Sequence, residues 1–304
     1  MKKYIYVYLM VFLFVFTSTK LVAGSVELTG RAEFNYKINS EFKTSSSNWL
    51  ASDNAAYLVV KSGSVVLVMD VKYTAPDIVA SYVNEFFVPW KVNNNLTIFF
   101  GYRNVADYDG FLGNDGSFKW GMNGTGILWY KTVISLIYGV SNFVIDAGTS
   151  FSYPLDYVVL FKSNMGAFSL SANVKGKADF SEGMFGIRTG IKTGPFAFYL
   201  AGGYNFISLN ISGLLLGIVY NLNPLKASAE VDITNFNAPR FGGYVEYNLV
   251  TYKVGVAGNY QLLTGAFYLE PYLSTRLGQA DVKPSLRFNE TGFKEFNVMV
   301  GFNF

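Results

Sequence analysis

The last ten residues of the chain, Glu295 to Phe304, read EFNVMVGFNF and alternate between two kinds of side chain without a break. One set is apolar and comprises Phe296, Val298, Val300, Phe302 and Phe304. Side chains that alternate in this way point to opposite faces of a β-strand. A soluble domain rarely ends on an apolar strand, whereas a closed barrel in lipid must pair its last strand with its first. The ending therefore predicts the closing strand of a membrane barrel.

This ending resembles the terminal strand of bacterial outer-membrane β-barrel proteins. In that family the final residue is typically aromatic, usually Phe, and apolar residues precede it at every second position, as Phe304 and the four apolar residues before it do here. The resemblance implies that this strand is read by the barrel-assembly machinery and that the barrel lies in outer-membrane lipid. The alternative is an amphipathic last strand of a soluble β-sandwich.

The segment 26–37 shows the two-faced pattern most clearly. Val26, Leu28, Gly30, Ala32, Phe34 and Tyr36 form one face, and Glu27, Thr29, Arg31, Glu33, Asn35 and Lys37 form the other. A shift of one residue would turn four charged side chains toward lipid, where each Lys or Arg costs about 2–4 kcal/mol near the midplane. The pattern therefore predicts which face meets hydrocarbon and which lines a wet interior.

The composition also favours a barrel in lipid. Hydrophobic residues make up 51% of the 304-residue chain and aromatic residues 18%, whereas only 15% are charged. A soluble protein would need a large core to bury so many Phe and Tyr side chains, but a transmembrane barrel places them on its outer face and in interfacial girdles.

The N-terminus is typical of an export signal. Lys2 and Lys3 precede an apolar run over 4–16, and a small-residue cleavage site follows at Ala23. A 13-residue run is too short for a membrane-spanning helix, which needs about 20 residues. We expect residues 1–23 to be a cleaved signal peptide and residues 24–304 to form one barrel in the bacterial outer membrane. An uncleaved anchor is the alternative.

Charge and missing residue types exclude several functions. Without the predicted signal the chain carries 21 basic and 21 acidic residues, so its charge gives no reason to expect a nucleic-acid partner. It contains neither Cys nor His, which excludes disulfides, thiolate or imidazole metal sites and Ser-His-Asp catalysis. We therefore predict no catalytic residues, no metal and no cofactor.

Strand-sized segments follow one another along the whole chain, and their connections alternate in length. Brief turns are predicted at 62–63, 93–94, 163–164, 194–195, 223–224 and 250–251, and longer polar segments at 38–54, 104–123, 176–183 and 234–242. Short turns at one end and longer loops at the other are typical of an antiparallel up-and-down β-barrel, which requires an even strand number. The tally gives 18 strands, including single strands over 124–131 and 133–144, and 16 is the alternative.

The segment 104–123 is the candidate functional loop. It contains Asp107, Asp109 and Asp115 together with four aromatic residues. Its place after the predicted fifth strand is similar to that of the third external loop of general porins, which folds into the lumen. We therefore hypothesise that these acids face Arg31, Arg103 and Arg188 across a pore constriction, where charge clusters set ion preference. The alternative is a solvated external loop.

Together these features predict a passive pore through which small hydrophilic solutes or ions diffuse, and no enzyme activity. The resemblance to 16-strand porins implies a homotrimer, although relatives with fewer strands are often monomers. Two alternatives stay open, a structural or adhesive barrel with a closed lumen and a secreted soluble β-rich binding protein.

Overall fold

The computed structural model describes residues 26–47, 54–74, 78–106, 129–233 and 238–304 of the chain. All regular structure in these residues is β-strand. The predicted signal peptide 1–23 lies outside the described residues. Among the residues described there is no helix of the length and hydrophobicity that would cross a membrane.

The described residues form nineteen strand segments. They are β1 (Val26–Asn39), β2 (Thr44–Ser47), β3 (Asn54–Ser62), β4 (Val65–Thr74), β5 (Ile78–Lys91), β6 (Leu96–Ala106), β7 (Trp129–Val140), β8 (Phe143–Thr149), β9 (Asp156–Met165) and β10 (Phe168–Lys177). The series continues with β11 (Gly183–Thr193), β12 (Phe196–Asn205), β13 (Asn210–Leu222), β14 (Leu225–Asp232), β15 (Arg240–Asn248), β16 (Tyr252–Gln261), β17 (Phe267–Leu277), β18 (Ala280–Asn289) and β19 (Gly292–Asn303).

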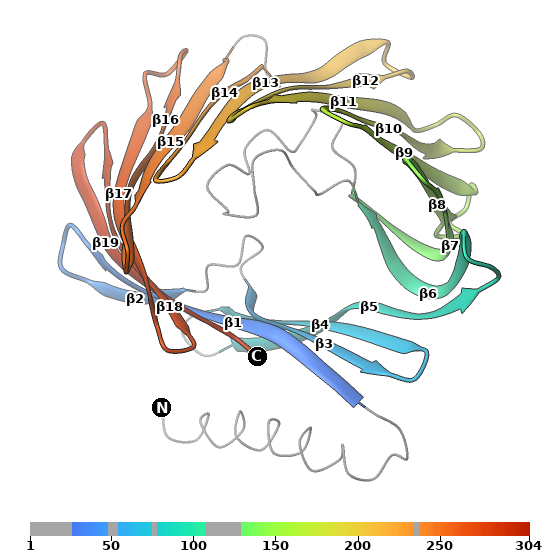
Figure 1. The fold of residues 1–304 in the computed structure, drawn as a ribbon, viewed down its shortest axis with the longest axis horizontal. Helices are drawn as coiled ribbons and strands as arrows, with labels where there is room; N and C mark the ends of the chain where they lie inside the picture. The colour runs from blue at the N-terminus through green and yellow to red at the C-terminus, as the bar shows by residue number, and fades with distance from the viewer. Residues whose placement is uncertain (1–25, 48–53, 75–77, 107–128, 234–237) are drawn as a thin grey trace.

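These segments form a closed antiparallel ring of 18 strands, each paired with its sequence neighbours (Figure 1). The number is 18 because β2 and β3 occupy one position: β2 pairs with residues 35–38 of β1, and β3 pairs with residues 26–32 of the same edge. The predicted up-and-down barrel is thereby confirmed, and 18 rather than 16 is the strand number.

The barrel closes where β19 meets β1. Their ladder runs from Arg31 opposite Asn303 to Asn39 opposite Glu295. Beyond it, Gly30 and Phe304 exchange two backbone hydrogen bonds of 2.8 and 3.1 Å. The last residue of the chain therefore completes the seam, and neither terminal strand presents an unpaired edge here.

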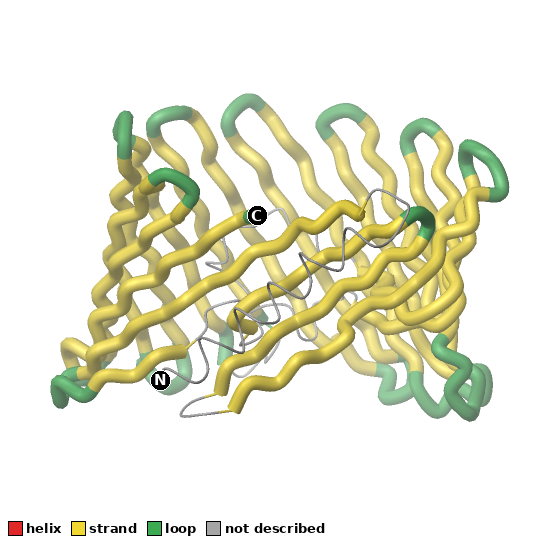
Figure 2. The backbone as a smooth tube through the Cα atoms, turned by 90° about the horizontal axis from the view of Figure 1, so that it is seen from below, coloured by secondary structure: helices red, strands yellow, loops and turns green. Residues whose placement is uncertain are grey.

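The two ends of the barrel differ, as Figure 2 shows from the side. The start of β1, the end of β19 and brief turns such as 63–64, 166–167 and 194–195 lie at one end. The connections at the other end include 150–155, 178–182 and 262–266, which are longer. The predicted alternation of short turns and longer loops is confirmed for these connections.

Several predicted strand boundaries were wrong. The predicted break between the strands 124–131 and 133–144 lies inside β7, which runs without interruption from Trp129 to Val140. The apolar run 133–144 is not one strand, because Ser141 adopts a positive φ of 40° and forms with Asn142 the turn between β7 and β8. The turn predicted at 163–164 also lies inside β9, and the chain reverses at 166–167, where Gly166 adopts a φ of 63°. Glycine supplies that conformation without the steric cost that a Cβ would impose.

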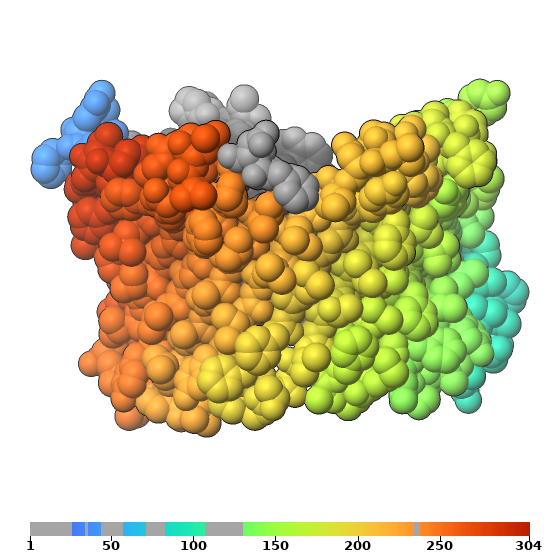
Figure 3. Space-filling model, turned by 90° about the horizontal axis from the view of Figure 1, so that it is seen from above, coloured from blue at the N-terminus to red at the C-terminus, as the bar shows by residue number. Residues whose placement is uncertain are grey.

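The strand faces are inverted relative to a soluble protein. Large apolar side chains such as Phe198, Leu216 and Val256 are exposed on the outer surface, whereas polar ones such as Glu33, Asp146 and Glu270 are buried. Figure 3 shows the outer face of the barrel on the side of the yellow and orange strands. An apolar exterior on a closed sheet fits hydrocarbon, since neighbouring strands of the ring pair their backbone groups with one another.

The inverted faces predict unequal tolerance of charge on one strand. Val256→Arg on β16 should lower the free energy of unfolding in lipid vesicles by about 2–4 kcal/mol, because the guanidinium would enter hydrocarbon. Asn259→Arg on the inner face of the same strand should change it by less than about 1 kcal/mol. Urea titration of both variants in vesicles measures the difference, and equal costs would contradict the assigned faces.

Candidate functional site: the inner wall of the barrel

The inner wall is built by alternation, because every second residue of each strand points inward. Across the seam this places Arg31 and Glu33 of β1 beside Asp281 of β18 and Asn303 of β19. Arg31 donates hydrogen bonds to Glu33, to Asp281 at 2.9 Å and to Asn303 at 3.0 Å. Gly301 leaves room for this guanidinium, since a Cβ there would lie 2.5 Å from Arg31 Nη2.

A second charged cluster continues along the same wall. Arg287 on β18 forms ion pairs with Glu270 on β17 at 2.8 Å and with Glu295 on β19 at 3.0 Å, and Lys37 on β1 lies 3.9 Å from Glu295. The guanidinium of Arg287 also lies 5.2 Å from the centre of the Tyr268 ring. Bases and acids alternate around the seam, so the wall is largely neutralised in this sector.

Arg103 forms the most directional pair of the wall. Its two Nη atoms donate to the two carboxylate oxygens of Asp146 at 2.8 and 2.6 Å, and Nη1 also donates to Ser135 at 3.1 Å. The guanidinium carbon lies 4.3 Å from the centre of the Phe99 ring. A bidentate pair backed by an aromatic ring holds the guanidinium in one orientation.

The end of β6 is held against the inner wall. The strand contains a bulge between Phe100 and Arg103, where Gly101 adopts a φ of 113° close to the carbonyl oxygen of Phe86. Beyond this bulge Val105 is fully buried against Val158 and Leu160 of β9. Bulges bend a strand and redirect its side chains. The end of β6, which is the last described part of the chain before the 107–128 segment, therefore lies on the inside of the barrel.

The structure places the three predicted basic residues on different strands. Arg31 lies on β1, Arg103 on β6 and Arg188 on β11, all on the inner face, and the first two pair with acids of the wall itself. Arg188 is buried opposite Ser171 and Ala201. The three predicted acids, Asp107, Asp109 and Asp115, lie outside the described residues. The constriction hypothesis therefore stays a prediction.

The predicted assembly strand lies in β19. Val298, Val300 and Phe302 belong to its outward face, and Phe296 shares that parity, whereas Asn297, Met299 and Gly301 between them are buried on the inner side. Phe304 follows the strand, and its ring reaches Gly30 of β1, where a Cβ would lie 2.8 Å from it. Recognition of this strand by an assembly machinery stays a prediction.

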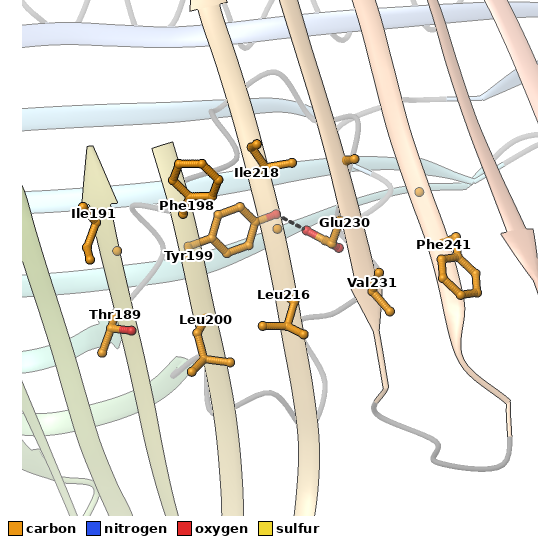
Figure 4. Close-up of a pocket in the computed structure, with 14 residues that line it drawn as sticks. Thr189, Ile191, Phe198, Tyr199, Leu200, Leu216, Ile218, Glu230, Val231 and Phe241 are labelled. Atoms are coloured by element: carbon orange, nitrogen blue, oxygen red, sulfur yellow. Dashed lines mark hydrogen bonds between the residues drawn. The ribbon is translucent and has the colours of Figure 1, made fainter. Parts of the chain in front are cut away.

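Sequence reasoning missed a recurring tyrosine–glycine–glutamate arrangement. Tyr199 on β12 lies across Gly217 on β13 and donates a 2.7 Å hydrogen bond to Glu230 on β14 (Figure 4). A Cβ on Gly217 would lie 1.9 Å from the tyrosine ring. Tyr272 on β17 crosses Gly255 on β16 in the same way and donates to Glu246 on β15 at 3.0 Å.

Only the cross-strand register brings these residues together, so no local sequence pattern signals them. Each ring covers a glycine backbone and donates to a carboxylate two strands away. Tyr199 also packs with Ala201, Leu215 and Val219 on the inner face. A hollow of about 660 Å³ lies beside Tyr199, Gly217 and Glu230. Outward side chains such as Phe198, Leu216 and Phe241 also line it.

At the loop end of the wall, Asp156 accepts hydrogen bonds from Tyr130 at 2.5 Å, from Thr149 at 2.8 Å and from the backbone nitrogen of Ser150 at 2.9 Å. The Ser150 hydroxyl is a further donor. This carboxylate is therefore saturated by wall groups. Among the described residues, no group of three or more His, Cys, Asp or Glu side chains could hold a metal ion.

Solved structures with a similar fold include porins. A five-substitution variant of the Rhodopseudomonas blastica porin superposes with a TM-score of 0.53 at 9% identity, and a triple mutant of that porin with 0.54 at 9%, each covering 92% of this chain and 100% of the other. A structure described under the words asymmetric conductivity of engineered proteins gives 0.53 at 9% with the same coverage. No protein-family model matches the sequence. No curated protein matches it either. The chain therefore has a porin-like β-barrel fold.

The tyrosine–glycine contact predicts a steep local cost. Gly217→Ala should lower the free energy of unfolding by about 1–3 kcal/mol, because the methyl group displaces the Tyr199 ring from Glu230. Gly202→Ala on β12 is the matched control, since a Cβ there meets no atom closer than 3.6 Å. Urea titration in detergent or vesicles compares them. In a Tyr199→Ala background the Gly217→Ala cost should largely vanish, and a persistent cost would refute the contact as its cause.

Proposed function

We propose that this protein is a passive pore of the bacterial outer membrane, through which small hydrophilic solutes or ions diffuse down their gradients. The observation that carries the proposal is a closed 18-strand ring with an apolar exterior and charged side chains along its inner wall. A charged inner wall holds water, and its charge and width select among solutes. The fold shared with porins supports the same function, although the identity is 9–10%.

The location belongs to the same proposal. We propose that residues 1–23 direct export and are removed, that residues 24–304 insert as the barrel, and that the strand ending at Phe304 is read by the assembly machinery. The outward row Val298, Val300 and Phe302 supports contact with outer-membrane lipid. We also propose that the barrel forms a homotrimer. The pore needs no catalytic group or cofactor.

The pore is tested by planar-bilayer recording of the purified, refolded chain. Discrete conductance steps are expected, because water and ions fill a barrel whose inner wall is charged. A heat-denatured sample is the control. A folded barrel that gives no steps and no liposome swelling would favour a structural or adhesive barrel with a closed lumen. Extraction from membranes without detergent would instead favour a soluble β-protein.

The constriction hypothesis is tested in the same recordings. Asp107→Asn/Asp109→Asn should raise the anion-to-cation permeability ratio and alter the conductance, because two negative charges would leave the narrowest part of the pore. Asp179→Asn, in the exposed connection 178–182, is the control and should leave both quantities unchanged. Unchanged values in the double variant would reject the constriction role and leave a solvated external loop.

A further inference from the structure

Four connections at the loop end of the barrel carry an exposed apolar side chain in an unusual backbone conformation. These apolar tips are Phe42, Phe151, Phe180 and Leu209, which expose 88%, 57%, 68% and 73% of their surface. All four adopt a positive φ, between 53° and 59°. Bulky side chains rarely enter this left-handed region, and residues that do so cluster at functional positions. In the described turns at the other end of the barrel, a positive φ occurs only at glycines and at Ser141.

Hydrogen bonds within the turns hold the apolar tips in place. Before Phe42, the side-chain oxygen of Asn39 accepts backbone hydrogen bonds of 3.0 and 2.8 Å from the residues on either side of the tip. At Phe180, the Asp179 carboxylate accepts from the backbone nitrogen and the hydroxyl of Ser181 at 3.0 and 2.8 Å. Side-chain hydrogen bonds of this kind stabilise a tight turn. Each of these turns therefore presents its apolar side chain in a fixed position.

Each apolar tip has a polar residue on both sides in the sequence. The four triplets are Glu41-Phe42-Lys43, Ser150-Phe151-Ser152, Asp179-Phe180-Ser181 and Ser208-Leu209-Asn210. An apolar side chain between two polar ones suits a boundary where hydrocarbon meets water. A dry protein contact would bury the polar neighbours as well and would require hydrogen-bond partners for them.

The apolar tips lie where the outer surface of the barrel ends. Strands β10, β11 and β12 have 10, 11 and 10 residues, about what a tilted strand needs to cross hydrocarbon. The connection 206–209 therefore begins near the edge of the hydrocarbon layer. Ile211, just beyond it, pairs with Tyr204 and is 56% exposed on the outer face. The apolar outer surface thus continues directly to the tip at Leu209.

The tips are also spread around the ring. They lie between β1 and β2, between β8 and β9, between β10 and β11, and between β12 and β13 (Figure 1). Strands β3 to β7 separate the first tip from the second. A protein partner would cover one sector of such a ring, whereas the lipid of a leaflet surrounds it on all sides.

We propose that Phe42, Phe151, Phe180 and Leu209 are lipid anchors, which insert into the membrane interface at the loop end and fix the height at which the barrel sits. The partner is the lipid of that leaflet. The turn hydrogen bonds hold each side chain ready for insertion, and the polar neighbours stay among the headgroups. The inference rests on the proposed membrane location of the barrel and does not require an open pore.

The test uses the absence of cysteine from the sequence, which allows one spin label at a time. Phe180→Cys and Leu209→Cys are labelled and reconstituted in phosphatidylcholine vesicles. Collisions of the label with oxygen, which partitions into lipid, are compared with collisions with a water-soluble nickel chelate. Glu290→Cys is the matched control, because Glu290 is an exposed polar residue of another turn at the same end. The oxygen-to-nickel ratio at the two tips should exceed that at position 290 about twofold or more.

The alternative outcomes are distinct. A ratio at the tips equal to that at position 290 would overturn the lipid anchors. Spin–spin broadening between copies labelled at position 180 would do so as well, because a second copy would then cover the tip. Val256→Cys on the outer face reports the membrane itself. A label there that the nickel chelate reaches freely would overturn the membrane location and the anchors with it.

A second measurement separates lipid contact from a role in the turn alone. Asn adopts a positive φ more readily than Phe or Leu, so Phe42→Asn/Phe180→Asn/Leu209→Asn keeps the turns and removes the apolar side chains. Relief of backbone strain alone would raise the urea midpoint of unfolding in vesicles. Loss of lipid contact should lower it, and Glu290→Asn should leave it unchanged. An unchanged or higher midpoint in the triple variant would overturn the proposal.

Discussion

The structure depends on one constraint, that every backbone donor and acceptor of a chain crossing hydrocarbon must be paired within the chain. A β-sheet meets that constraint only when it closes on itself, and here closure is the ladder between β1 and β19. Gly30 and Phe304 carry the pairing to the last residue. The register at the seam also fixes the faces of β1, because a shift of one residue would turn its inward charges Arg31, Glu33 and Lys37 outward.

Much of this fold could be predicted from the sequence, because a strand with one lipid face and one wet face records its orientation in alternate residues. The terminal stretch EFNVMVGFNF and the segment 26–37 both indicated the face each side chain would take. The ends of strands were harder to predict, because two residues are enough for a turn. In the run 133–144 the polar pair Ser141 and Asn142 forms the turn, with a positive φ at Ser141, and the prediction continued the strand through it.

The candidate site was harder to predict from the sequence than the fold. Its side chains lie on different strands and meet only through the register in which those strands pair. Arg31, Arg103 and Arg188 were expected on the inner wall and lie there. Their partners were not foreseen, because Asp281 is 250 residues from Arg31 and Asp146 is 43 from Arg103. The tyrosines that cross Gly217 and Gly255 are of the same kind, as each contact spans three strands.

These side-chain contacts differ between sectors of the barrel wall. Around the seam, ion pairs hold Arg31 and Arg287 against the sheet. Between β12 and β17, hydrogen bonds from Tyr199 to Glu230 and from Tyr272 to Glu246 do the same. In the sector β10–β13 small and uncharged residues make up most of the inner face. The side-chain contacts therefore differ from one sector of the wall to the next, whereas the ladder of backbone hydrogen bonds between neighbouring strands is common to all of them.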